Sequence, residues 1–206
     1  MRKITVVCLV AREPGWLCLQ KLWDLRDEYE IKLILSHRKK PSSEDPFRGP
    51  RPDFERFKDF ARSSKISFGE VDSYRDAAEM GALDRVGHFD VLFSCNWKYL
   101  IPERVLPLAR LGTINLHRGK LPEYKGLEPV KRALLNGEKN IFLTAHKIEK
   151  DYDSGEILGT GSIQVKKVPA ESIDETTERL KQELHPLYPE VMLKALKQLK
   201  KKGIGV

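Results

Sequence analysis

The sequence contains few cysteines and no long apolar run. Its three cysteines, Cys8, Cys18 and Cys95, are scattered, and no two of them stand at metal-ligand spacing. We therefore expect no metal site, and we expect buried free thiols in a reducing cytoplasm. No window approaches the roughly 18 apolar residues of a membrane-spanning helix, so a membrane span is not expected either.

The sequence also lacks the features of a secretory leader. The first residues, MRKITVVCLV, place a short apolar run between charges and have no small-residue cleavage site. They predict a buried strand over 3–10 rather than a signal peptide. Pro14 and Gly15 predict a turn over Arg12 to Gly15, and apolar residues at helical spacing follow from Trp16 to Leu25.

Strand and helix patterns then alternate along the chain. A second strand over 30–36 completes a strand–helix–strand unit, which implies a parallel sheet. The remaining predicted helices lie over 53–64, 73–87, 102–109 and 128–136, then from 172 to an interruption near Pro186 and Pro189, with a last helix to about Lys202. The remaining predicted strands lie near 66–68, 89–96, 112–117, 141–148 and 161–168. The last two strands could pair antiparallel, and Ser172 with Glu175 forms a capping box. Since no repeat or linker is evident, we expect one α/β domain over 1–206.

Positive charge is the main compositional bias. The formal net charge is +7, and residues 37–65 hold nine Lys and Arg against five Asp and Glu. A solvated surface would account for this bias. The alternative is attraction of an anion such as a phosphorylated metabolite, a polyglutamylated cofactor or RNA. The proline-rich loop over 37–52 follows a strand, and ligands bind at such strand ends in α/β sheets.

The segment INLHRGKLPEYKG contains the first candidate site residues. Asn115 and His117 are two apart on a predicted strand, so their side chains share one face. Polar groups at the end of a buried strand are costly unless they are paired. Loop backbone could satisfy both side chains, and a functional site is the other interpretation.

The segment KDYDSGEIL adds carboxylates at a bend between two strands. Asp151 and Asp153 precede Gly155, which suits either an Asx turn or a site. An amide can stabilise an oxygen that gains charge, a histidine can move a proton, and a carboxylate can hold the imidazolium. This set suits attack of an amine on a carbonyl carbon. No G-x-S-x-G serine is present and no cysteine is near His117 in sequence, which favours direct transfer between two bound substrates.

These two segments together resemble the folate-dependent formyltransferase family. Its signature is Asn-x-His, a Leu-Pro loop ending in Gly, and a later Asp before a small residue and Gly. The resemblance implies a Rossmann-like, mostly parallel central sheet with helices on both faces, and 10-formyltetrahydrofolate as formyl donor. It further implies that Asn115 and His117 bind the formyl oxygen as it becomes an oxyanion, and that Asp153 supports His117 and helps to remove the amine proton.

The resemblance also implies a cofactor-binding segment over 96–106. By position, its backbone and apolar side chains would hold the pteridine, and the 149–153 loop would close the other side. The cofactor-binding residues carried over are Lys98, Tyr99, Leu100, Val105 and, chiefly through main chain, Asp151.

The acceptor is less defined by these motifs. The glycinamide branch binds the substrate phosphate with a Gly- and Ser-rich loop, but this chain has VAREPGWL there, so Arg12 is the candidate anion-binding residue. A surface role for Arg12, or a pairing with Glu13, is the alternative. Gly119 and Lys120 also replace a common Ser-Leu pair, which suggests an unusual substrate or cofactor tail.

We expect the acceptor to be a primary amine of a small anionic metabolite. An amino-sugar nucleotide is the first choice, and glycinamide ribonucleotide is the second. We expect the chain after Asp153 to be too short for the extra domain of methionyl-tRNA formyltransferases, so nucleic acid is not the expected substrate. Two alternative functions remain: a formyltetrahydrofolate hydrolase and a non-catalytic module that binds RNA or protein. The sequence does not distinguish a monomer from a homodimer.

Overall fold

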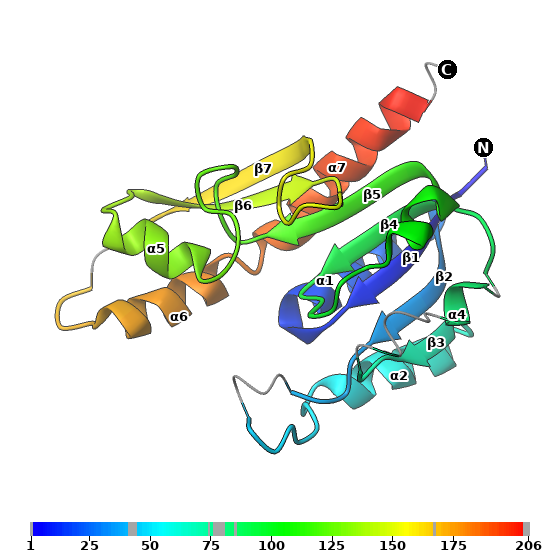
Figure 1. Cartoon of the computed structure of the whole chain (residues 1–206), viewed down its shortest axis with the longest axis horizontal. Helices are drawn as coiled ribbons and strands as arrows, with labels where there is room; N and C mark the ends of the chain where they lie inside the picture. The colour runs from blue at the N-terminus through cyan, green and yellow to red at the C-terminus, as the bar shows by residue number, and fades with distance from the viewer. Residues whose placement is uncertain are drawn as a thin grey trace. The chain divides into compact units, whose positions relative to one another are not determined.

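The computed structural model describes residues 2–40, 45–73, 75, 81–84, 86–166 and 168–203. It has the predicted α/β fold, with a seven-stranded, mostly parallel sheet in the order β3-β2-β1-β4-β5-β6-β7 (Figure 1). The chain divides into two compact units, Met1–Thr113 and Ile114–Val206. Strand β5 (Ala109–His117) crosses the boundary between them.

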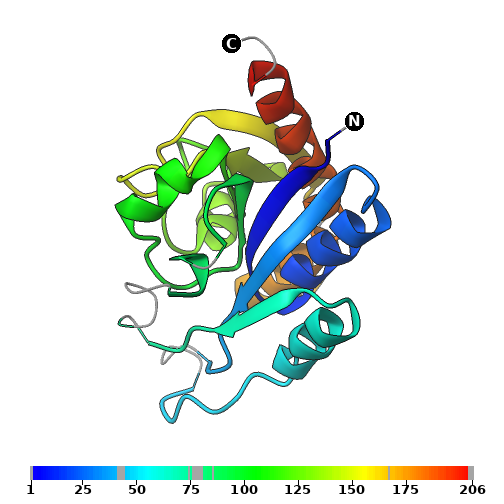
Figure 2. The same ribbon diagram turned by 90° about the vertical axis from the view of Figure 1, so that its right-hand side faces the viewer.

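The first unit is built on parallel strands. Its complete strands are β1 (Ile4–Val10), β2 (Tyr29–Ser36), β3 (Ser67–Glu70) and β4 (Phe89–Cys95). β1 pairs with β2 and β4, and β2 pairs with β3, all in parallel (Figure 2). Every residue of β4 is buried, which explains its mostly apolar sequence.

The helices of the first unit pack on these strands. They are α1 (Arg12–Asp24), α2 (Phe54–Ser63), the short α4 (Gly81–Asp84) and the 3₁₀ helix η1 (Glu103–Leu108). α1 contacts β1 and β2, and α2 contacts β2 and β3. The helix predicted over 102–109 is present as the 3₁₀ helix η1. Most of the helix predicted over 73–87 lies outside the described residues.

The turn predicted over Arg12 to Gly15 is wrong, because α1 already begins at Arg12. Pro14 is the third residue of the helix, where a backbone N–H has no intrahelical acceptor, so its missing donor costs nothing. Gly15 permits a close approach to β1, since an added Cβ would lie 3.1 Å from Cβ of Val10.

The second unit is built on antiparallel strands. β6 (Asn140–His146) pairs with the end of β5 and with β7 (Ile157–Gln164), which confirms the predicted antiparallel pair. Its helices are α5 (Pro129–Leu135), α6 (Ile173–Glu183) and α7 (Leu187–Gly203). The capping box of Ser172 and Glu175 is confirmed at the start of α6.

Glycines in β7 allow α7 to pack closely on it. An added Cβ at Gly159 would lie 3.0 Å from Cβ of Lys194, and one at Gly161 would lie 2.9 Å from Cγ2 of Val191. Larger residues on this face of β7 would therefore separate the helix from the strand. None of the helices in the described ranges has the length and apolar character needed to cross a membrane.

Candidate active site

Strands β5 and β6 place Asn115 directly opposite His146. The two residues are cross-strand partners, and Nδ2 of Asn115 lies 3.1 Å from Nε2 of His146. His117 is the partner of Thr144 two positions along, and its ring centroid lies 6.5 Å from that of His146. Asn115 and His117 thus share the face that their spacing predicted.

Asp153 connects the two histidines. Its Oδ2 atom lies 3.2 Å from Nδ1 of His117, and its Oδ1 atom lies 3.3 Å from Nε2 of His146. The backbone N–H of Gly126 also donates to Oδ2, at 3.0 Å. Asp153 adopts a left-handed backbone conformation with φ of 49°, which an Asp tolerates better than most residues. The two segments INLHRGKLPEYKG and KDYDSGEIL therefore meet at this carboxylate.

Hydrogen bonds determine the tautomer of His146. Its Nδ1 atom lies 2.7 Å from the carbonyl oxygen of Lys147, which can only accept, so Nδ1 carries a proton. In the neutral ring, Nε2 then accepts from the amide N–H of Asn115, whereas in the protonated ring Nε2 carries a proton and donates to Oδ1 of Asp153. The contact made by the neutral ring orients the Asn115 amide and leaves its second N–H as a donor for a substrate oxygen.

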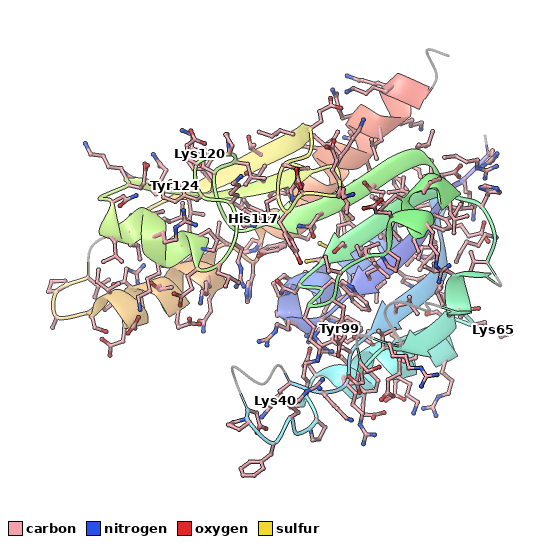
Figure 3. All side chains as sticks on the ribbon, viewed as in Figure 1. Lys40, Lys65, Tyr99, His117, Lys120 and Tyr124 are labelled. Atoms are coloured by element: carbon pink, nitrogen blue, oxygen red, sulfur yellow. The ribbon has the colours of Figure 1, made fainter. Side chains whose placement is uncertain are left out.

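His117 lies between two acceptors and is almost fully buried. Its Nε2–H donates to the carbonyl oxygen of Tyr124 at 2.7 Å, and Figure 3 labels both residues. Its Nδ1 atom faces Asp153. Burial lowers the pKa of His117, although the Tyr124 carbonyl and the Asp153 carboxylate favour the protonated form. When the ring is neutral, the short contact with Tyr124 keeps the proton on Nε2, and Nδ1 can act as a base.

The carboxylate of Asp153 stays ionised. Burial alone would raise its pKa, but the contact with His146, the charge of His117 and the Gly126 N–H lower it below its ordinary value. A fixed carboxylate against two imidazole rings can take up or relay a proton. Within the described residues, no group of three or more His, Cys, Asp or Glu side chains could hold a metal ion.

The loop after β5 folds back onto His117 because residue 119 is glycine. An added Cβ there would lie 2.8 Å from each of three atoms, including Nε2 of His117 and the carbonyl oxygen of Tyr124. Oγ1 of Thr144 donates to the Gly119 carbonyl at 2.7 Å and holds the loop in place. Lys120 pairs with Glu123 at 2.7 Å, so its charge has a partner within the loop.

The first unit holds most of the residues predicted to bind the cofactor. Nζ of Lys98 donates to the carbonyl of Lys39 at 2.6 Å and lies 4.9 Å from the ring centroid of Tyr99. The buried Tyr99 accepts a hydrogen bond from Arg48 at 3.3 Å. Lys98 and Tyr99 therefore lie together, as their adjacent positions suggested.

The other predicted ligand-binding residues differ in exposure. Leu100 is 56% exposed, whereas Val105 in η1 is completely buried and packs in the core. Asp151 is exposed, and its carbonyl accepts from the hydroxyl of Ser154. Arg12 is the first residue of α1 and has a left-handed φ of 62°. Their ligand-binding roles stay predictions.

A family model described as formyl transferase matches residues 5–193. The chain belongs to the formyl transferase family. The polar set of Asn115, His117 and Asp153 lies inside the matched region, as do all the predicted cofactor-binding residues.

Curated relatives are similar to this chain over different lengths. A methionyl-tRNA formyltransferase of Caldanaerobacter subterraneus subsp. tengcongensis is 28% identical over 88% of this chain, which corresponds to 55% of that protein. The bifunctional polymyxin resistance protein ArnA of Wigglesworthia glossinidia brevipalpis is 38% identical over 37% of this chain and 12% of ArnA. The chain thus spans about half the length of the methionyl-tRNA formyltransferases that it matches.

Solved structures share the fold. Glycinamide ribonucleotide transformylase 1 from Symbiobacterium toebii aligns with a TM-score of 0.66 at 22% identity, covering 92% of this chain and 85% of that one. A formyltetrahydrofolate deformylase from Pseudomonas syringae aligns with a TM-score of 0.73 at 18% identity, covering 98% and 62%. At these identities the likeness establishes the fold alone.

His146 belongs to this site, although the sequence patterns did not predict it. It ends a predicted strand seven residues before Asp153, so a polar residue at a buried strand end was the available signal. The pairing of β6 with β5 was not predicted, and only that register places His146 against Asn115.

Proposed function

We propose that this formyl transferase moves a formyl group from 10-formyltetrahydrofolate to a primary amine of a small anionic metabolite. The observation that carries the proposal is the contact of Asp153 with both His117 and His146, beside an Asn115 amide oriented by His146. This arrangement offers an oxyanion donor and a proton acceptor without a nucleophile of the protein.

The reaction would proceed by direct transfer. The amine nitrogen adds to the formyl carbon, and the carbonyl oxygen becomes an oxyanion that the free N–H of Asn115 stabilises. The amine loses a proton towards Asp153 and His117, and N10 of the folate takes up a proton as its bond to the carbon breaks. The products are the formamide and tetrahydrofolate.

His117 can contribute in two ways. As a proton carrier it needs only the contact between its Nδ1 atom and Asp153. As a second donor to the oxyanion it would have to exchange its Nε2–H contact with the Tyr124 carbonyl for one with the formyl oxygen. Replacing that carbonyl by a charged oxygen would strengthen the bond as the negative charge develops.

For the acceptor, we propose an amino-sugar nucleotide, on the resemblance of NWKYLIPE (96–103), INLHRGKLPEYKG (114–126) and LLNGE (134–138) to the sugar-nucleotide branch of the family. Three competing acceptors follow from the names of the related proteins. These are glycinamide ribonucleotide, methionyl-tRNA and, for a deformylase, water. The experiment must therefore compare all four.

The decisive experiment is release of tetrahydrofolate from 10-formyltetrahydrofolate by the purified chain. It is run without an acceptor and then with an amino-sugar nucleotide, glycinamide ribonucleotide or charged methionyl-tRNA. We expect release that depends on the amino-sugar nucleotide. Release without any acceptor would support a hydrolase, and absence of both release and folate binding would contradict the proposal.

A further inference from the structure

A second group of buried polar side chains lies in the first unit, near the carboxyl ends of its parallel strands. His37 directly follows β2, Trp97 follows β4, and Arg51 lies in the loop between β2 and α2. His37 is 1% exposed and Arg51 is 4% exposed. Such burial is rare for an arginine and normally requires a full set of acceptors.

Several donors of this group have no acceptor in the described part of the protein. Nη2 of Arg51 donates to Oγ of Ser36 at 3.1 Å, and Nη1 lies 3.5 Å from Oδ2 of Asp53, too far for a well-formed bond. Nε and Nη1 of Arg51, Nε1 of Trp97 and Nδ1 of His37 are buried without a hydrogen-bond partner. These atoms come from two segments that are distant in sequence, the loop between β2 and α2 and the residues that follow β4.

Ring packing fixes the direction of these donors. The rings of His37, Trp97 and Tyr99 pack edge to face in all three pairs, with centroids 5.8, 5.9 and 6.2 Å apart. The guanidinium of Arg51 lies 5.9 Å from the ring centroid of Phe57. The donors are therefore held rigidly, as expected of a binding site rather than of a solvated surface.

The surroundings carry positive charge. Burial and the charges of Arg51, Lys98 and Arg12 lower the pKa of His37 to about 2. His37 is therefore neutral at physiological pH, while the cations that act on it would attract an anion. Burial lowers the pKa of Arg51; the carboxylates of Asp53 and Asp72 oppose this effect, and the charges of Arg12 and Arg56 add to it.

We infer that Arg51, Trp97 and His37 form a binding site for a phosphoryl group. Arginine presents paired N–H donors that match phosphoryl oxygens, and the indole N–H adds a donor from another direction. Donors from the loop between β2 and α2 and from the segment after β4 suit a group with several oxygens, and a phosphoryl group offers more of them than a carboxylate does. The assignment of this group to the amine acceptor rests on the proposed function, but binding itself needs no turnover.

Matched substitutions separate this role from a structural one. Trp97→Phe removes the indole N–H and keeps an aromatic ring against His37 and Tyr99. Arg51→Lys keeps the charge and removes the paired donors. Trp23→Phe is the control, because Trp23 lies on α1 and its ring packs on Phe60, away from His37.

The experiment is calorimetric titration of the full chain with inorganic phosphate, pyrophosphate, UDP and, as a carboxylate, malonate, at constant ionic strength. We expect pyrophosphate to bind the wild type and the Trp23→Phe variant equally. Trp97→Phe and Arg51→Lys should each weaken binding about tenfold or more, since hydrogen bonds to charged groups are strong. Tighter binding of UDP than of pyrophosphate would identify a nucleotide, and equal binding would place the contacts on the phosphoryl groups alone.

Three results would overturn the inference: no binding of any phosphoryl compound, equal binding by all four proteins, or preference for malonate. Thermal unfolding without ligand confirms that each variant is folded. An Asp153→Asn variant distinguishes the two proposals, because it should lose formyl transfer and still bind pyrophosphate. Suppose that the wild type binds pyrophosphate but shows no formyl transfer, and that Trp97→Phe loses pyrophosphate binding. That result would refute the proposed function and leave the phosphoryl site standing.

Discussion

Asp153 lies 3.2 Å from Nδ1 of His117, although the two residues belong to different segments of the second unit. The same carboxylate accepts the backbone N–H of Gly126 and lies 3.3 Å from Nε2 of His146. One side chain therefore joins the end of β5, the following loop and the end of β6. The proposed chemistry depends on this carboxylate more than on any other group.

We expect Asp153→Asn to lower the rate of formyl transfer by about 10²–10⁴-fold, the usual contribution of a general acid or base. The amide can still accept from Gly126, so the fold should persist, but it carries no charge to take up a proton. Steady-state kinetics and thermal unfolding measure the two effects. Asp59→Asn, an exposed change in α2, is the control, and equal rates in both variants would remove Asp153 from the mechanism.

His146 should act by positioning Asn115. We expect His146→Leu to lower kcat about tenfold, because a hydrogen bond of about 1 kcal/mol or more that orients the amide is lost. His146→Gln supplies another acceptor and should recover part of the rate. The exposed His88 provides the control substitution His88→Gln. A His146→Leu enzyme with the wild-type kcat would show that Asn115 needs no orientation by His146.

Stability should fall on acidification because of His37. Its folded pKa of about 2 lies below the ordinary value of 6.5, so in this range only the unfolded chain binds the proton. The contribution of neutral His37 to the free energy of unfolding is fully present above the pKa of the unfolded chain. As the pH falls below that pKa, the contribution decreases by about 1.4 kcal/mol per pH unit.

Urea unfolding of the wild type and of His37→Phe, between about pH 7 and about pH 4, measures this difference. The phenyl ring keeps the aromatic packing, and other groups titrate alike in both chains, so the difference in slope isolates His37. If the free energies of unfolding of the two proteins changed equally with pH, the low pKa of His37 would be contradicted.

Gly155→Ala should lower the free energy of unfolding by about 1–3 kcal/mol, the usual cost of overpacking. The new Cβ would lie 2.1 Å from the carbonyl oxygen of Lys147, and backbone cannot move away as a side chain can. Gly81→Ala is the matched control, because nothing lies within 4 Å of its Cβ and it begins the short helix α4. Equal urea midpoints for the two variants would show that the loop adapts freely.

Local sequence patterns predicted much of this fold. The strands β1, β2 and β4 follow from their mostly apolar sequences. The capping box marks the start of α6 because its bonds join neighbouring residues. The turn predicted at Arg12 to Gly15 failed because Pro14 and Gly15 are tolerated in a first helical turn, where packing against β1 favours glycine.

The sequence by itself determined that Asn115 and His117 share one face, since alternation along a strand is a local property. Only the tertiary structure decided which groups meet them there. The β5–β6 register places His146 opposite Asn115, and the left-handed backbone at Asp153 accompanies its contacts with both histidines. Burial of Arg51 is likewise a tertiary outcome. Register and burial depend on contacts between distant segments, and a local pattern does not contain them.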